Sequence, residues 1–185
     1  CNGSQDLVIG FRNSTDGWVE HWQRGPTGMF GFVSRVVTRK ADTVDVSPNG
    51  LVATASASLP LQVHRLDGTV VANNGPFAII AKFAPNGDWI LANTTAGVKL
   101  LPTSTAGESG AKSLGLGPCF SIDWSPDGQY ALALGGPHDS STLYVIPTGK
   151  ARAAKSRSVL VGNRGRIVAS PDGRAIALYT VSSTD

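Results

Sequence analysis

Four stretches of the chain repeat one pattern of hydrophobic and polar positions. Each has a short run rich in β-branched and aromatic residues, a tetrapeptide of the form Ser/Ala-Pro-Asn/Asp-Gly, and a second apolar run. The copies read VDVSPNGLVATAS from Val44, AKFAPNGDWILAN from Ala81, IDWSPDGQYALAL from Ile122 and IVASPDGRAIALY from Ile167. Their tetrapeptides begin 37, 41 and 45 residues apart. Self-similarity at this period indicates a repeat architecture.

The tetrapeptide predicts a tight turn between two strands. Proline presets φ for the turn, Asn or Asp tolerates the left-handed region, and glycine adopts a positive φ freely. We therefore expect Gly128 and Gly173 to have conformations that other residues resist. Because the link is so short, each pair of strands must form an antiparallel hairpin.

Two further strands complete each unit. The third strands read LQVHRLD from Leu61, GVKLLPT from Gly97 and STLYVIPTG from Ser141; the weaker fourth strands read TVVANN from Thr69, AKSLGLG from Ala111 and RSVLVGN from Arg157. No stretch with helical periodicity interrupts the pattern. Repeated four-stranded antiparallel units of about 40 residues are typical of propeller blades. The predicted fold is therefore an all-β β-propeller.

The strand count predicts an incomplete ring within a single domain or fragment, 1–185. About four to four and a half blades are visible: a partial blade at 6–39, blades at 40–75, 76–117 and 118–163, and a partial blade at 164–185. A propeller normally closes, because closure protects the edges of its sheets. We expect the chain to be part of a larger ring. The alternatives are a tight four- or five-bladed ring and self-association of two incomplete rings.

The repeated SPDG phrase resembles TolB-like and WD-repeat propellers over residues 6–185. The segment STDGWVEHWQ, from Ser14, is similar to the WD-repeat passage that ends in Trp-Asp, although Gln23 stands in place of that aspartate. The resemblance implies a non-enzymatic binding or scaffold module for a protein partner or a small ligand. It also implies an alternative, the gating or substrate-recognition domain of a larger hydrolase such as a prolyl-oligopeptidase-like serine peptidase. A catalytic domain downstream of Asp185 would decide for that alternative.

Charge is unevenly distributed along the chain. Residues 150–185 hold 7 Lys and Arg against 2 Asp and Glu, whereas residues 1–149 hold 9 against 11. The basic stretch 150–166 contains no aromatic residue that could stack on a base, so nucleic-acid binding is not expected. Only 16% of the chain is charged, which favours a packed, sheet-rich protein. The sequence contains no run of 18 apolar residues, so it does not predict a transmembrane segment.

The sequence predicts no catalytic, cofactor-binding or metal-binding residue. His138, Asp139 and Ser140 are adjacent in a predicted polar loop, and adjacent side chains point in different directions and rarely form a triad. No nucleophile elbow, phosphate-binding loop or zinc motif occurs. His21 and His64 lie on predicted third strands and are interpreted as structural or surface residues. We therefore expect a protein that is not an enzyme, unless the chain is part of a larger one.

The two cysteines have different expected states. Cys119 precedes an apolar strand and is expected to be a buried free thiol. A chain that starts CNGSQ resembles a bacterial lipoprotein after signal-peptide cleavage, which makes Cys1 a candidate for lipid attachment. This would place the protein in the bacterial envelope or periplasm. The alternative is a chain boundary that falls on a cysteine.

One charged position recurs on the predicted innermost strands. Asp45, Lys82 and Asp123 each lie two residues before the turn, with apolar neighbours on both sides. The repeat register places them at one level on adjacent blades, so we expect Lys82 to lie between the two aspartates. One interpretation is a set of ion pairs that joins neighbouring blades. The other is a polar channel site for a small ligand or cation.

Overall fold

The computed structural model describes residues 6–12, 16–39, 41–107, 109–136, 141–148, 157–162 and 165–180. These residues form seventeen strands in five antiparallel sheets and no helix, which confirms the all-β prediction for the described part of the chain. Accordingly, no helix in these ranges could cross a membrane.

The sheets are built from strands that are consecutive in the chain. The first sheet contains β1 (Asp6–Arg12), β2 (Asp16–Arg24) and β3 (Phe30–Arg39). The second contains β4 (Thr43–Val46), β5 (Leu51–Ser56), β6 (Leu59–Arg65) and β7 (Val70–Ala72). The third contains β8 (Ala78–Phe83), β9 (Trp89–Thr94), β10 (Gly97–Pro102) and β11 (Lys112–Ser113). The fourth contains β12 (Cys119–Trp124), β13 (Tyr130–Gly135), β14 (Ser141–Pro147) and β15 (Arg157–Gly162), and the fifth contains β16 (Gly165–Ala169) and β17 (Ile176–Thr180).

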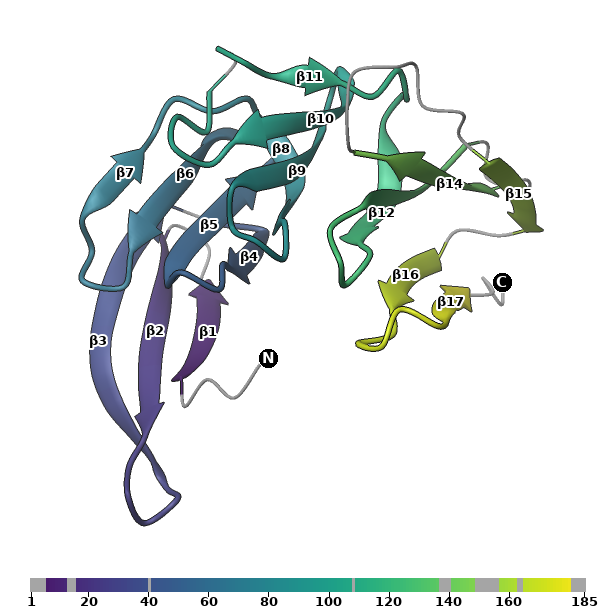
Figure 1. Ribbon diagram of the computed structural model, residues 1–185. Helices are drawn as coiled ribbons and strands as arrows, with labels where there is room; N and C mark the ends of the chain where they lie inside the picture. The colour runs from purple at the N-terminus through teal and green to yellow at the C-terminus, as the bar shows by residue number, and fades with distance from the viewer. Residues whose placement is uncertain are drawn as a thin grey trace, which may run out of the picture.

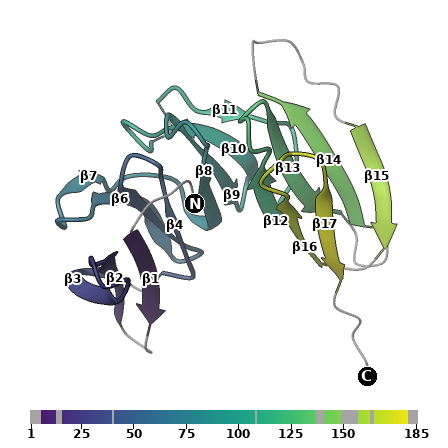
Figure 2. The same cartoon turned by 60° about the horizontal axis from the view of Figure 1, so that its bottom comes forward.

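The five sheets follow one another in an arc (Figures 1 and 2). The strands β4, β8, β12 and β16, which begin the second to fifth sheets, are consecutive neighbours in space. Within the described residues the first and fifth sheets share no strand, so the sheets do not close into a ring.

The hydrophobic core lies between the faces of successive sheets. On β9, Ile90 packs in a cluster with the second sheet, whereas Leu91 packs in a cluster with the fourth. On β13, Ala131 faces the third sheet and Leu132 the fifth. Because both faces of these strands are buried, their sequences are nearly continuous apolar runs rather than alternating ones.

The four tetrapeptides form the predicted turns. Their glycines have φ values of +73°, +78°, +70° and +71° at Gly50, Gly87, Gly128 and Gly173. In the third turn, the Ser125 hydroxyl donates to the Asp127 carboxylate and accepts the backbone N–H of Tyr130. The Ser125 hydroxyl thereby lowers the pKa of Asp127. The side chains and the backbone thus specify the same turn.

Replacing Gly128 or Gly173 with valine is expected to destabilise the protein by about 1 kcal/mol or more, because a β-branched residue resists a positive φ. Gly117→Ala is the matched control, since its added Cβ meets no heavy atom within 4 Å and its φ is not in the left-handed region. Urea denaturation measures the free energies of unfolding. The turn assignment would be contradicted if both valine variants unfolded at the same urea concentration as the unchanged protein.

Candidate functional site

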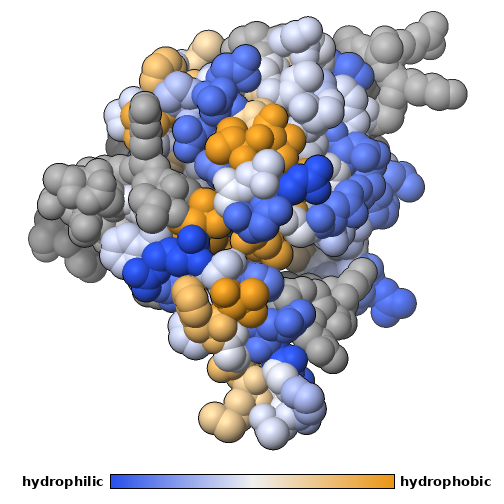
Figure 3. All heavy atoms as spheres, turned by 90° about the vertical axis from the view of Figure 1, so that its left-hand side faces the viewer, coloured by the Kyte–Doolittle hydropathy of each residue, from blue (hydrophilic) through white to orange (hydrophobic). Residues whose placement is uncertain are grey.

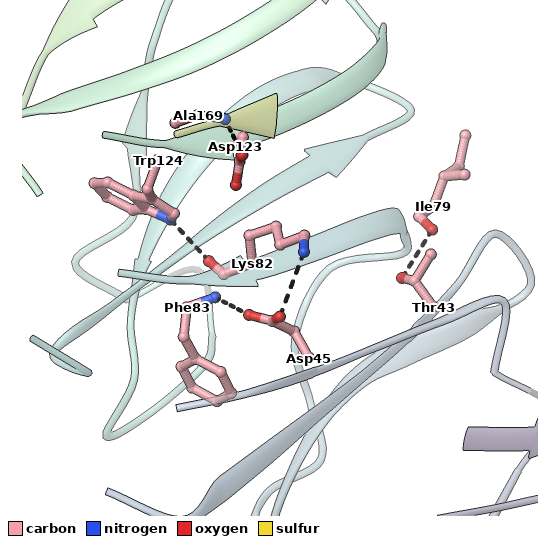
Figure 4. A network of polar contacts seen from close by, with 8 residues as sticks. All are labelled: Thr43, Asp45, Ile79, Lys82, Phe83, Asp123, Trp124 and Ala169. Atoms are coloured by element: carbon pink, nitrogen blue, oxygen red, sulfur yellow. Dashed lines mark hydrogen bonds and ion pairs between the residues drawn. The ribbon is translucent and has the colours of Figure 1, made fainter. Parts of the chain in front are cut away.

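The structure brings two of the three predicted inner-strand charges together. Asp45 on β4 and Lys82 on β8 form an ion pair in which Lys82 Nζ lies 3.5 Å from Asp45 Oδ1 (Figure 4). The Lys82 side chain is 40% exposed and that of Asp45 is 21% exposed. The pair joins the second sheet to the third, at the level that the repeat register predicts.

The second oxygen of Asp45 makes the shorter contact. Asp45 Oδ2 accepts a hydrogen bond of 2.7 Å from the backbone N–H of Phe83, the residue that follows Lys82. Burial raises the pKa of Asp45, and the nearby Lys82 ammonium opposes this change. Asp45 therefore acts mainly as a forward acceptor for a backbone donor on the next sheet.

Asp123 makes the same kind of contact one step further along the arc. Its Oδ2 accepts a hydrogen bond of 2.9 Å from the backbone N–H of Ala169 on β16. Lys82 lies on the strand between the two aspartates, as expected, but among the described residues it forms an ion pair with Asp45 and none with Asp123. The reason is directional: each aspartate reaches forward to the next sheet, whereas the Lys82 ammonium points back to the preceding one (Figure 4).

The junction between the third and fourth sheets uses a different donor. At the position where the second and fourth sheets have an aspartate, the third sheet has Lys82, which carries no carboxylate. The indole Nε1–H of Trp124 donates instead to the backbone carbonyl of Lys82 over 3.0 Å. Trp124 holds the repeat position that Phe83 and Ala169 hold on their own strands. The same level of the arc is therefore tied at each of these three junctions.

Other ties between sheets were not predicted from the sequence. Asn93 on β9 is fully buried; its side-chain amide donates to the Cys119 carbonyl, and its Oδ1 accepts the Cys119 N–H over 3.0 Å. The Ser121 hydroxyl accepts the backbone N–H of Ile167 over 3.2 Å. The sequence signal is a polar residue that follows an apolar run within a strand, as Asn93 follows WILA in WILANT.

These contacts make the inner strands a structural junction between neighbouring sheets. No group of three His, Cys, Asp or Glu side chains that could hold a metal ion occurs among the described residues. The carboxylates of Asp45 and Asp123 are instead engaged by backbone donors. The geometry therefore favours the interpretation of contacts between neighbouring sheets over that of a polar channel site.

His64 lies in the contact between the first and second sheets. It is 5% exposed, and neither ring nitrogen has a hydrogen-bond partner. Burial lowers the pKa of His64. The surrounding gap is lined by Val19, His21, Val36, Val52, His64 and Leu66 and is too narrow for a water molecule. His64 is thus a neutral core residue, as its structural interpretation implies.

Acid is expected to weaken the protein through His64. Because its folded-state pKa lies below that of an unfolded histidine, about 6.5, neutral His64 contributes stability that is lost as the pH falls through this value. The free energy of unfolding falls by at most about 1.4 kcal/mol for each pH unit through this one group. Urea denaturation at pH 7.5 and pH 5.0 measures the loss, which His64→Leu should reduce. Equal losses in the two proteins would show that His64 does not carry the effect.

Cys119 is a buried free thiol, as predicted, and burial raises its pKa to about 11. It is therefore a poor nucleophile at neutral pH. Cys1, the segment His138–Ser140 and most of the basic stretch 150–166 lie outside the described residues.

The β2–β3 hairpin carries an exposed apolar surface. It projects beyond the other sheets in Figure 1, and pale orange side chains lie among white and blue ones at the lower end of the face in Figure 3. Met29, Phe30, Phe32 and Val33 form this hairpin surface and are exposed by 75%, 45%, 52% and 51%. Phe32 also packs edge-on against Trp22, with ring centroids 5.6 Å apart. Grouped exposed apolar residues of this kind mark interaction sites.

No protein-family model and no curated protein matches the sequence. Among solved structures, the chain is similar to Kuenenia stuttgartiensis hydrazine synthase, with a TM-score of 0.74 and 16% identity over 94% of this chain and 52% of that one. It is also similar to a functionally unknown protein from Desulfotomaculum acetoxidans, with a TM-score of 0.64 and 18% identity over 96% of this chain and 63% of that one. The chain therefore spans less than two thirds of either structure. At these identities the likeness shows a β-rich fold alone.

Proposed function

We propose that the chain is an arc of a β-propeller, in the TolB-like or WD-like class, and acts as a non-enzymatic binding platform for a protein partner. Consecutive four-stranded sheets around neighbouring first strands support the propeller. The greater length of the two similar structures, of which this chain covers 52% and 63%, supports a larger ring.

The exposed hairpin surface carries the proposal of binding. The second to fifth sheets are held together by contacts between buried sheet faces and by hydrogen bonds between the inner strands. The β2–β3 hairpin adds four large apolar side chains that are 45–75% exposed, those of Met29, Phe30, Phe32 and Val33. Such side chains are costly in water and bind well to a partner.

Photo-crosslinking in the source organism tests this proposal. A photoreactive amino acid in place of Phe32 should crosslink to a partner protein, whereas the same group in place of Asn86, in an exposed turn of the third sheet, should not. The proposal would be overturned if the folded protein formed no crosslink to any protein from these two positions or from further surface positions. A catalytic domain in the same polypeptide would support the gating-domain alternative instead.

Lipid attachment at Cys1, and with it an envelope location, remains a separate proposal. It rests on the resemblance of CNGSQ to a processed lipoprotein N-terminus. Mass spectrometry of the protein purified from its source tests it, because acylation adds the mass of the lipid to the N-terminal peptide.

A further inference from the structure

The outermost strands of the sheets differ greatly in length. In the second and third sheets, β7 has three residues and β11 has two. Short outer strands are one of the devices by which proteins prevent their sheet edges from pairing with other chains. In the first sheet the outermost strand, β3, has ten residues. The outer strand of the first sheet is therefore longer than those of the second and third sheets and longer than β15, which has six residues.

The outer edge of β3 is open within the described part of the chain. β3 pairs with β2 on one side, and no described strand pairs with its other side. The side chains of Phe30, Phe32 and Val33 on this strand are exposed. The strand thus offers both an unpaired backbone and apolar side chains, which together permit the addition of a strand from a partner.

The charge around this edge indicates what kind of segment fits. In the sequence, residues 24–39, which include β3 and the turn before it, contain Arg24, Arg35 and Arg39 and no acidic residue. Within this stretch, the guanidinium of Arg35 donates to the carboxylate of Glu20 on β2. Two copies of β3 placed edge to edge would bring like charges together, and such pairs are destabilising. A segment with acidic residues complements this edge better than a second copy of the chain.

We propose that the edge of β3 binds an extended segment of a partner protein in which apolar and acidic residues alternate, by addition as a further strand of the first sheet. This inference rests on the proposed binding function and specifies its site and the chemistry of the partner. A β-bulge at Val33, where the register shifts between His21 and Trp22 of β2, limits regular pairing to a short segment on one side of it.

A synthetic peptide provides the first test. The probe is acetyl-Val-Glu-Val-Glu-Val-Glu-Val-amide with a fluorescent label, and binding is followed by anisotropy. The matched peptides replace glutamate with lysine or carry N-methyl groups on alternate residues, which removes the main-chain donors on one edge. Both changes should weaken binding about tenfold or more. Equal binding of all three peptides, or binding of none, would overturn the inference.

A pair of equally exposed valines provides the protein control. Val33 on β3 and Val70 on β7 are each 51% exposed. Val33→Glu should weaken peptide binding about tenfold or more, and Val70→Glu should leave it unchanged. Equal effects of the two variants would overturn the inference. The inference would also be overturned if Val33→Glu left peptide binding unchanged and instead abolished binding to phosphatidylglycerol vesicles or the formation of a dimer in solution.

The inference and the proposed function can fail separately. If crosslinking identifies a partner whose binding is unchanged by Val33→Glu, the β3 edge is not the site, although the platform proposal stands. If crosslinks are absent from all surface positions, the platform proposal itself fails. Hydrogen exchange of residues 30–39 adds a direct measurement, because strand addition should slow exchange there and not in β7.

Discussion

Replacing Asn93 with leucine is expected to lower the free energy of unfolding by about 3 kcal/mol, the largest loss among the variants considered. Asn93 is fully buried and its side chain satisfies both the N–H and the carbonyl of Cys119 across the junction of the third and fourth sheets. Leucine keeps a side chain of similar size and cannot replace either hydrogen bond. Each buried backbone group left without its partner costs about 1–3 kcal/mol.

The matched control is Asn86→Ala in an exposed turn of the third sheet. The Asn86 side chain also accepts a backbone N–H, that of Asp88, but water can replace this bond. Its loss should cost less than about 1 kcal/mol. Urea denaturation at pH 7.5 measures both variants. If Asn93→Leu cost no more than Asn86→Ala, the contact with Cys119 would not contribute to the junction.

Alanine at Asp45 or Asp123 is expected to cost about 1–3 kcal/mol each, because the N–H of Phe83 or Ala169 then loses its acceptor. Lys82→Met should cost less than about 1 kcal/mol, since the ammonium is partly exposed and pairs with one aspartate at 3.5 Å. The bridging arrangement expected from the sequence would have made Lys82→Met the costly change. Urea denaturation of the three single variants decides between them. A loss for Lys82→Met larger than that for either aspartate variant would contradict the forward-acceptor assignment.

The strands and turns could be predicted because their signals are local. A Ser-Pro-Asp-Gly sequence fixes its own backbone conformation, and the Ser125–Asp127 contact lies within three residues of chain. The repeat register also predicts that Asp45 and Lys82 lie at one level. It does not predict the direction in which each side chain reaches, because level is a property of the strand and direction depends on packing between sheets.

Two other features depend on parts of the chain that are distant in sequence. The pairing of Asn93 with Cys119 spans 26 residues and requires that the start of β12 lies against the face of β9. Exposure of the hairpin surface is equally non-local: the run MFGFVSRVVT from Met29 predicts a strand, but an apolar strand does not indicate whether another element covers it. Both properties are set by the arrangement of sheets rather than by any one segment.

The forward direction of the aspartate contacts also gives the arc an order of assembly. Chains emerge from the ribosome N-terminus first, so Asp45 is synthesised before Phe83 and Asp123 before Ala169. Each acceptor is therefore synthesised before the strand that carries its donor. At the fifth sheet the corresponding position is Val168, which has no acceptor. The third sheet has Lys82 at this position and is joined to the fourth by the Trp124 indole instead, so a junction without an aspartate needs a different tie.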